Sequence, residues 1–348
     1  MGYFIAFLVI AAVFYMVGND KTSSTKRCLV FSSIFLFVLS AFRAISIGSD
    51  TRRYSYLFRY ANELSFSQIF EEFQQEPLYF LLCKIVGFLC NGNFQFMIAF
   101  VALLYITSLY VFLDKFSSNS FISFVMLLSL GLFYFSISAM RQTIAISLLL
   151  FSYHFVMKRK FVPFALLVAL ATLSHNSAIV FLLVYFFKNI KIGAKQVFAV
   201  ITSVFLSFIM GDKIINALFF LSGNDLGDRN IKTLTWMGFI IQFSIMAFAM
   251  LFYERTVINN KNNICLYNTM FIGLCIQAFA VNFAEMFRLS MYFSIFNIAL
   301  IPNAMDSIKD NRMKKLVEIL VVLVFLSYYF LFNWNDELII PYKFFWQT

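Results

Sequence analysis

Long apolar segments separated by short polar ones recur from one end of this sequence to the other. Most of them run for about 17–25 residues, which lets a helix cross about 30 Å of hydrocarbon. They are continuous and lack the polar–apolar alternation of a membrane β-barrel. The sequence therefore predicts an all-α polytopic membrane protein, a single integral membrane domain over residues 1–348 with about twelve transmembrane helices.

The composition supports that class and excludes others. Hydrophobic residues make up 61% of the chain and charged residues only 13%, whereas soluble domains carry about 25% charged residues. The net charge of +10 comes from basic residues spread over the loops, which is typical of positive cytoplasmic loops and not of a nucleic-acid-binding stripe. The five cysteines lie in or beside apolar segments without a C-x-x-C pair, so we interpret them as packing residues.

Two basic clusters determine the predicted topology. Lys158–Lys160 ends one apolar helix, and Lys188 begins the next basic cluster along the chain. Both clusters lie in the cytoplasm if Phe161–Phe187 is a hairpin of two short helices that turns at Ser174–Ser177. Ser and Asn favour turns and helix caps, which supports this hairpin. We therefore expect His175 at the outer face of the membrane.

The same charge rule makes Pro77–Cys90 a short re-entrant or interfacial helix. Its fourteen residues give ~21 Å of helix, too short for a span. With this segment not crossing, Arg141 lies outside and the basic residues 158–160 lie inside. Residues 48–76 then form an outer loop, and their aromatic residues predict segments that lie along the membrane interface. Residues 222–233 form a shorter outer loop.

Lysines follow this topology, but arginines do not. The arginines placed on the outer side are Arg43, Arg52, Arg53, Arg59, Arg141, Arg229 and Arg288. A guanidinium group stays charged and binds carboxylate or phosphate oxygens with two N–H groups, so outer arginines indicate an anionic substrate such as a diphosphate. The alternative is pairing with local carboxylates or lipid headgroups, which we favour for Arg59. For Arg141, with no carboxylate within a turn, we favour substrate binding.

The chemistry available to this chain is narrow. His175, in the outer turn, is a candidate general base, phosphate donor or helix cap, whereas His154 is interpreted as structural. Glu285 and Arg288 are spaced i, i+3, so they either pair with each other or act on a substrate. No metal-site spacing, P-loop or G-x-S-x-G motif occurs. We therefore expect no metal site, no cofactor and no nucleotide-dependent reaction.

Six short motifs, in this order, resemble the EpsG/Wzy group of polysaccharide polymerases. They are Gly48-Ser49-Asp50-Thr51-Arg52-Arg53-Tyr54, Glu76-Pro77-Leu78-Tyr79, Met140-Arg141-Gln142-Thr143-Ile144-Ala145, Lys158-Arg159-Lys160, Ser174-His175-Asn176-Ser177-Ala178 and Phe287-Arg288-Leu289-Ser290-Met291-Tyr292-Phe293. The resemblance covers about residues 48–302. Its most specific part is the R-Q-x-I-A motif together with the later H-x-S-A motif.

The resemblance implies a glycosyltransferase of the bacterial inner membrane, similar to GT-C-type transferases, with its active face and the loops 48–76 and 222–233 in the periplasm. Such an enzyme transfers a growing glycan from undecaprenyl diphosphate to a lipid-linked oligosaccharide repeat unit, as in O-antigen synthesis, and needs no metal. Its partners are these lipid-linked substrates, membrane lipid and a chain-length regulator protein. The alternatives are an O-antigen ligase, a lipid-linked oligosaccharide flippase and a receptor or structural membrane protein.

The resemblance also suggests roles for individual residues. The residues expected to bind diphosphate or sugar are Arg141, Arg288, Arg52, Arg53, Gln142, Tyr54 and Arg229. The candidates for the base that deprotonates the acceptor hydroxyl are His175, Glu76, Asp50 and Glu285. We favour His175 or Glu76, and the sequence does not choose between them.

Overall fold

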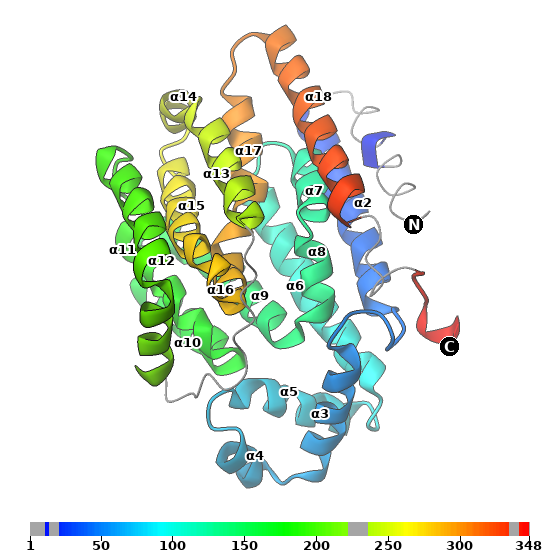
Figure 1. Ribbon diagram of the computed structural model, residues 1–348. Coiled ribbons are helices and arrows are strands. Elements are labelled where there is room, and N and C mark those ends of the chain that lie inside the picture. Colours follow the sequence, from blue (N-terminus) through cyan, green and yellow to red (C-terminus); the bar gives the residue numbers. More distant parts are fainter. Residues whose placement is uncertain (1–10, 14–20, 222–235, 334–340, 348) are drawn as a thin grey trace. The chain divides into compact units, whose positions relative to one another are not determined.

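The computed structural model describes residues 11–13, 21–221, 236–333 and 341–347, and helices and loops make up nearly all of this part of the chain. Figure 1 shows the helices in chain order. The predicted all-α class is confirmed. Most of the first predicted helix and all of the predicted loop 222–233 lie outside the described residues, as does Arg229.

Several helices are long and apolar enough to cross a membrane. Four such spans occur among the described residues: Ser23–Ala41, Phe94–Phe116, Asn263–Val281 and Asn311–Phe332. Two bent helix pairs would raise the number to six, and the shorter apolar helices are Pro77–Leu89, Phe161–Ser174, Asn176–Phe187 and Ala194–Ile209. The chain is therefore a polytopic membrane protein. The number of about twelve spans stays a prediction.

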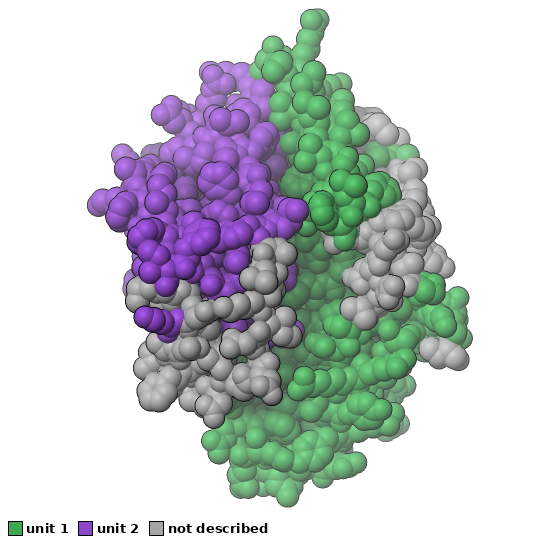
Figure 2. Space-filling model, viewed as in Figure 1, with its two compact units in different colours: residues 1–182, 310–348 green, residues 183–309 purple. Residues whose placement is uncertain are grey.

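The chain divides into two compact units, residues 1–182 with 310–348 and residues 183–309 (Figure 2). The helices of the first unit are α2 (Lys21–Ala41), α3 (Thr51–Glu63), α4 (Phe66–Glu72), α5 (Pro77–Leu89), α6 (Phe94–Phe116), α7 (Ser120–Ser129), α8 (Leu132–Ser138), α9 (Met140–Met157), α10 (Phe161–Ser174), η1 (Asn176–Phe181), α18 (Asn311–Tyr328), η3 (Tyr329–Asn333) and η4 (Phe345–Gln347). Within it, α9 packs against both α6 and α10, and α2 packs against α6.

The segment 48–76 folds into two helices beside α5 (Figure 1). Helix α3 is amphipathic: Tyr54, Phe58 and Ala61 are buried at helical spacing, while Arg52 and Arg59 are exposed. The buried face joins a core with α5 that includes Tyr79. An amphipathic helix of this kind suits the expected interfacial position.

Two short helices expected from sequence end close to the predicted positions. Helix α5 ends at Leu89 after 13 residues, so this segment is a short helix. Helix α10 ends at Ser174, His175 is extended with φ −156°, and η1 begins at Asn176. The structure therefore confirms the break between two short helices, while their side of the membrane stays a prediction.

A bend between two other helices was not predicted. The apolar segment Phe121–Ile137 is not one continuous helix, because α7 and α8 meet at a bend of 59°. Gly131 lies between them with φ 73°, a left-handed conformation that glycine adopts without strain. The glycine therefore permits the change of direction between α7 and α8.

The second unit contains α12 (Ala194–Leu221), α13 (Met237–Met250), α14 (Tyr253–Asn259), α15 (Asn263–Gln277), η2 (Ala278–Val281), α16 (Ala284–Ser294) and α17 (Asn297–Asp306), and α11 (Leu182–Phe187) begins at its boundary. Buried polar side chains link its helices. Ser290 donates a hydrogen bond to Gln277, which also accepts one from Gln242 at 3.4 Å. Such bonds hold apolar helices in register.

Candidate functional site

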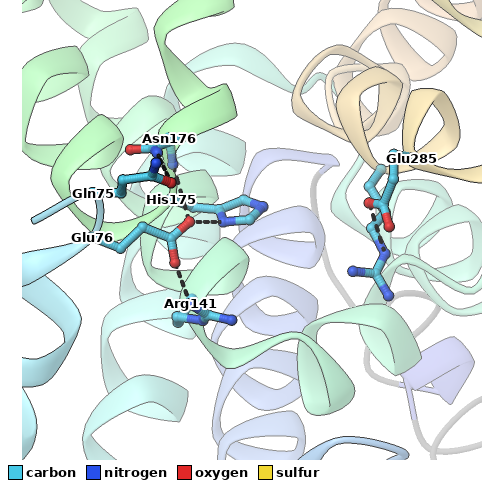
Figure 3. Close-up of polar contacts among 7 residues, drawn as sticks. Gln75, Glu76, Arg141, His175, Asn176 and Glu285 are labelled. Atoms are coloured by element: carbon cyan, nitrogen blue, oxygen red, sulfur yellow. Dashed lines mark hydrogen bonds and ion pairs between the residues drawn. The ribbon is translucent and has the colours of Figure 1, made fainter. Parts of the chain in front are cut away.

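Glu76 lies at the centre of a cluster of polar side chains (Figure 3). It is the last residue before α5, and Pro77 begins that helix. One carboxylate oxygen, Oε2, accepts a hydrogen bond from Nη1 of Arg141. The other, Oε1, lies 2.6 Å from Nδ1 of His175 and accepts the backbone N–H of Asn176 at 3.3 Å. The Glu76 side chain is 13% exposed, so these partners replace most of its water.

Breaks between helices position the three main groups. Arg141 is the second residue of α9, directly after the bend at Ala139 that separates it from α8. His175 is the extended residue between α10 and η1. Asn176 also donates from its side chain to Gln75 at 3.1 Å, which ties the α10–η1 turn to the segment before α5. Groups that are 65 and 99 residues apart in the sequence thus meet at one carboxylate.

The Arg141 side chain packs against aromatic rings. Its guanidinium carbon lies 5.9 Å from the centre of the Tyr54 ring, within the range of a cation–π interaction. Tyr54 in turn packs on Tyr79, with ring centres 5.5 Å apart. The Arg141 side chain is 26% exposed, and its Nε has no hydrogen-bond partner among the described residues. Arg141 therefore holds Glu76 with one N–H group and keeps others for a ligand.

The contact with Glu76 determines which nitrogen of His175 carries a proton. A carboxylate only accepts hydrogen bonds, so Nδ1 is the protonated nitrogen and Nε2 of the neutral ring keeps its lone pair. Nε2 has no hydrogen-bond partner within the described part of the chain, and the ring is 26% exposed. This arrangement gives a base that is oriented by a carboxylate.

The pKa of Glu76 is lowered by its partners. Burial by itself raises the pKa of this carboxyl group. The hydrogen bond and electrostatic interaction with His175, the charge of Arg141 and the backbone N–H of Asn176 together outweigh burial and bring the pKa below its ordinary value. Glu76 is therefore ionised at neutral pH and is a poor proton acceptor. This favours His175 over Glu76 as the base.

The other predicted site residues of the first unit make no hydrogen bond or ion pair with Glu76 among the described residues. Asp50 precedes α3 without a capping bond from its side chain. Arg52 and Arg53 are exposed on α3 and make no ion pair among the described residues. Gln142 is buried. Of the predicted diphosphate-binding residues of this unit, only Arg141 reaches Glu76, with Tyr54 packed against it.

Glu285 and Arg288 belong to the second unit and pair with each other on α16. Nε of Arg288 lies 3.7 Å from Oε2 of Glu285, and the two side chains are 49% and 45% exposed. The i, i+3 pairing that the sequence allowed is therefore present (Figure 3). An exposed pair of this length contributes little to stability.

Three residues at the site were not singled out from sequence. Gln75 and Asn176 join the two segments, and Tyr79 supports Tyr54. Asn176 and Tyr79 lie inside motifs of the EpsG/Wzy resemblance, and that position was the available signal. Arg43, predicted as an outer arginine, is 2% exposed and donates to the carbonyls of Ser40 and Ile137. Arg43 is therefore structural and is not available to a ligand.

Comparisons with known proteins yield one match. The model of the EpsG family matches residues 26–344, which includes Glu76, Arg141, His175 and α16. No curated protein and no solved structure matches the chain. Within the described residues, no group of three or more His, Cys, Asp or Glu side chains could hold a metal ion.

Proposed function

The chain belongs to the EpsG family, which indicates a membrane protein of polysaccharide synthesis, and we propose that it is a polysaccharide polymerase. In this proposal it transfers a glycan from undecaprenyl diphosphate to the terminal sugar of a lipid-linked oligosaccharide repeat unit. The observation that supports it most is the single carboxylate of Glu76, which contacts a base on one side and an anion-binding group on the other.

His175 acts as the general base in the proposed reaction. Nε2 takes the proton of the acceptor hydroxyl while the hydroxyl oxygen attacks the anomeric carbon. Glu76 holds the ring by Nδ1 and stabilises the imidazolium that forms. It does not become protonated itself, consistent with its lowered pKa.

Arg141 stabilises the leaving group. The bond between the anomeric carbon and the diphosphate oxygen breaks, and its electron pair leaves with undecaprenyl diphosphate. The guanidinium N–H groups that Glu76 does not use offer hydrogen bonds and positive charge to that oxygen. Packing on Tyr54 keeps the guanidinium in place before substrate arrives, so little reorganisation is needed.

The remaining features of the proposal rest on the charge of the loops and on the resemblance to EpsG/Wzy polymerases. Basic loop residues such as Lys158–Lys160 face the cytoplasm, so the Glu76 site faces the periplasm across the bacterial inner membrane. The fold is a GT-C-like bundle with about twelve spans. The reaction is metal-independent. Arg288 contributes to diphosphate binding, and a separate protein regulates chain length.

The direct test is polymer synthesis by variants of the three residues. His175→Ala, Glu76→Ala and Arg141→Ala should each remove long-chain polymer at wild-type protein levels, while Arg255→Ala, at an exposed arginine of α14, should not. Loss that leaves a lipid core with one repeat unit supports a polymerase. Loss of all attached glycan instead indicates a ligase. Normal long-chain polymer in the three variants contradicts the proposal.

Reconstitution with purified components distinguishes a polymerase from a flippase. Purified protein with lipid-linked repeat units should form longer glycans and release undecaprenyl diphosphate, and chelator should not change the rate. Translocation of the repeat unit without any new glycosidic bond would identify a flippase and contradict the polymerase.

A further inference from the structure

A pocket in the first unit is separate from the Glu76 cluster. It has a volume of about 570 Å³, within the range of ligand sites in proteins. The end of α2, the outer part of α3, the start of α6 and the C-terminal segment line it, and none of Glu76, Arg141 or His175 does. Its wall is mostly apolar, and its aromatic side chains are Phe42, Phe94, Phe96 and Phe345.

Arg59 gives this apolar pocket one positive charge. It is the only charged residue among the described residues that line the pocket. It is exposed and makes no hydrogen bond or ion pair in the described part of the chain. Glu63 follows one helical turn later on α3, yet it does not pair with Arg59. The guanidinium group therefore has no counter-ion among the residues that the structure describes.

The polar groups near Arg59 are largely used within the protein. Gln95 donates to the carbonyl oxygens of Ala41 at 2.7 Å and Arg43 at 3.2 Å. Asn93 accepts the backbone N–H of Gln95 with its side-chain oxygen at 2.9 Å. These bonds hold the start of α6 against the end of α2. They leave the guanidinium of Arg59 as the group available to an anion.

Three of the aromatic side chains that line the pocket are partly exposed. Phe42 is 37% exposed, Phe96 is 52% exposed and Phe345 is 42% exposed. Phe42 and Phe345 stack with ring centres 6.3 Å apart, and Trp346 packs beside them. Aromatic residues next to a basic one are typical of the membrane–water interface. The amphipathic helix α3, which carries Arg59, suits the same depth.

We propose that this pocket binds an anionic phospholipid of the surrounding membrane. The lipid phosphate lies against Arg59, and an acyl chain packs along Phe42, Phe96 and Phe345. An inorganic anion would leave the aromatic wall exposed. A zwitterionic lipid would bring an ammonium group to a pocket whose described lining has no carboxylate. The charge of the lining therefore favours a lipid with net negative charge, independently of the proposed reaction.

The test is lipid binding by the purified full-length protein in detergent. Phosphatidylglycerol and phosphatidylcholine are titrated separately, and binding is followed by native mass spectrometry and by the thermal unfolding midpoint. Wild type should bind phosphatidylglycerol more tightly than phosphatidylcholine. Arg59→Ala should weaken phosphatidylglycerol binding about fivefold, the effect of losing one basic residue at a lipid surface, and should remove the preference.

Matched variants separate the headgroup from the chain. Arg59→Lys keeps the charge and should keep most of the preference, and Arg255→Ala should behave as wild type. Phe96→Ala should weaken both lipids alike, because it shortens the apolar wall. Because Arg59, Phe96 and Arg255 are all exposed, these variants should keep the wild-type unfolding midpoint without added lipid.

Three results would overturn the assignment. One is equal binding of the two lipids by wild type, and another is unchanged phosphatidylglycerol binding by Arg59→Ala. The third is displacement of phosphatidylglycerol by undecaprenyl phosphate at lower concentration in wild type but not in Arg59→Ala. That result would assign the pocket to a lipid-linked substrate.

Discussion

Nδ1 of His175 lies 2.6 Å from Oε1 of Glu76, 99 residues earlier in the chain. The opposite oxygen of the same carboxylate accepts the hydrogen bond from Arg141. Glu76 therefore orients a candidate base and a candidate anion-binding group at once. A change at Glu76 disturbs both, whereas a change at His175 or Arg141 leaves the other contact in place.

Glu76→Gln should strongly reduce polymer formation while keeping the size of the side chain. The amide can donate as well as accept, so it no longer fixes the tautomer of His175, and it removes the charge that balances Arg141. We expect a rate loss on the order of 10²-fold or more in the reconstituted reaction. Asn176→Ala, which alters only the outer bond to Gln75, is the matched control. A rate within a few-fold of wild type for Glu76→Gln would reject the orienting role.

Arg141→Lys should lose function despite keeping the charge. A lysine ammonium cannot hold Glu76 and a diphosphate oxygen with the fixed planar geometry of guanidinium. We expect a rate loss of about tenfold to a hundredfold, compared by kcat and KM for the lipid-linked donor. In a double-mutant cycle with Glu76→Gln, the two losses should be non-additive because the residues share one contact. Full additivity would show that the pair is not coupled.

The stability of the folded protein should fall at acid pH because of Glu76. The folded-state pKa of this carboxyl group lies below its ordinary value of 4.5. Its contribution is therefore fully present above that value and is lost as the pH falls through the folded-state pKa. Thermal unfolding midpoints of the detergent-solubilised protein should decline across this window in wild type. Glu76→Gln should show a smaller decline, and an equal decline in the two proteins would contradict the prediction.

Gly48→Ala should destabilise the first unit. Gly48 has φ +94°, and an added Cβ would lie 2.8 Å from Oγ1 of Thr51 and 3.1 Å from the carbonyl oxygen of Ile137. We expect about 1–3 kcal/mol of lost stability from conformation and crowding together. Gly92 has φ +72° with open space around it, so Gly92→Ala reports the conformational part alone. Gly193→Ala meets neither restriction and should be neutral, and equal effects at all three positions would argue against the local strain.

The predicted topology can be tested by labelling from outside the cell. In a cysteine-free background, a cysteine at Ser177 should react with a membrane-impermeant maleimide, because it lies in the outer turn after His175. A cysteine at Lys160 should react only after the membrane is permeabilised. The reverse pattern would place the Glu76 site in the cytoplasm and would contradict the proposal of a periplasmic polymerase.

The local features of this protein were predictable from sequence. The membrane class follows from the length and hydrophobicity of the apolar segments, and the break at Ser174–Ser177 follows from turn-forming residues and loop charge. The motif order indicated the family, which the match over residues 26–344 confirms. The bend at Gly131, where φ is 73°, was not predicted from sequence.

The pairing of the charged residues was decided only by tertiary structure. The sequence favoured Arg141 for substrate binding and His175 or Glu76 as the base, but it did not show which of these residues meet. Packing of α3, α5, α9 and α10 places Arg141 and His175 against Glu76 and leaves Arg52 exposed. Arg43 is buried at the end of α2, where it donates to the carbonyls of Ser40 and Ile137. Hydrophobic pattern is a local property that each segment carries by itself. A buried carboxylate instead takes whichever donors the folded chain brings within hydrogen-bonding distance, and that choice depends on contacts across a hundred residues.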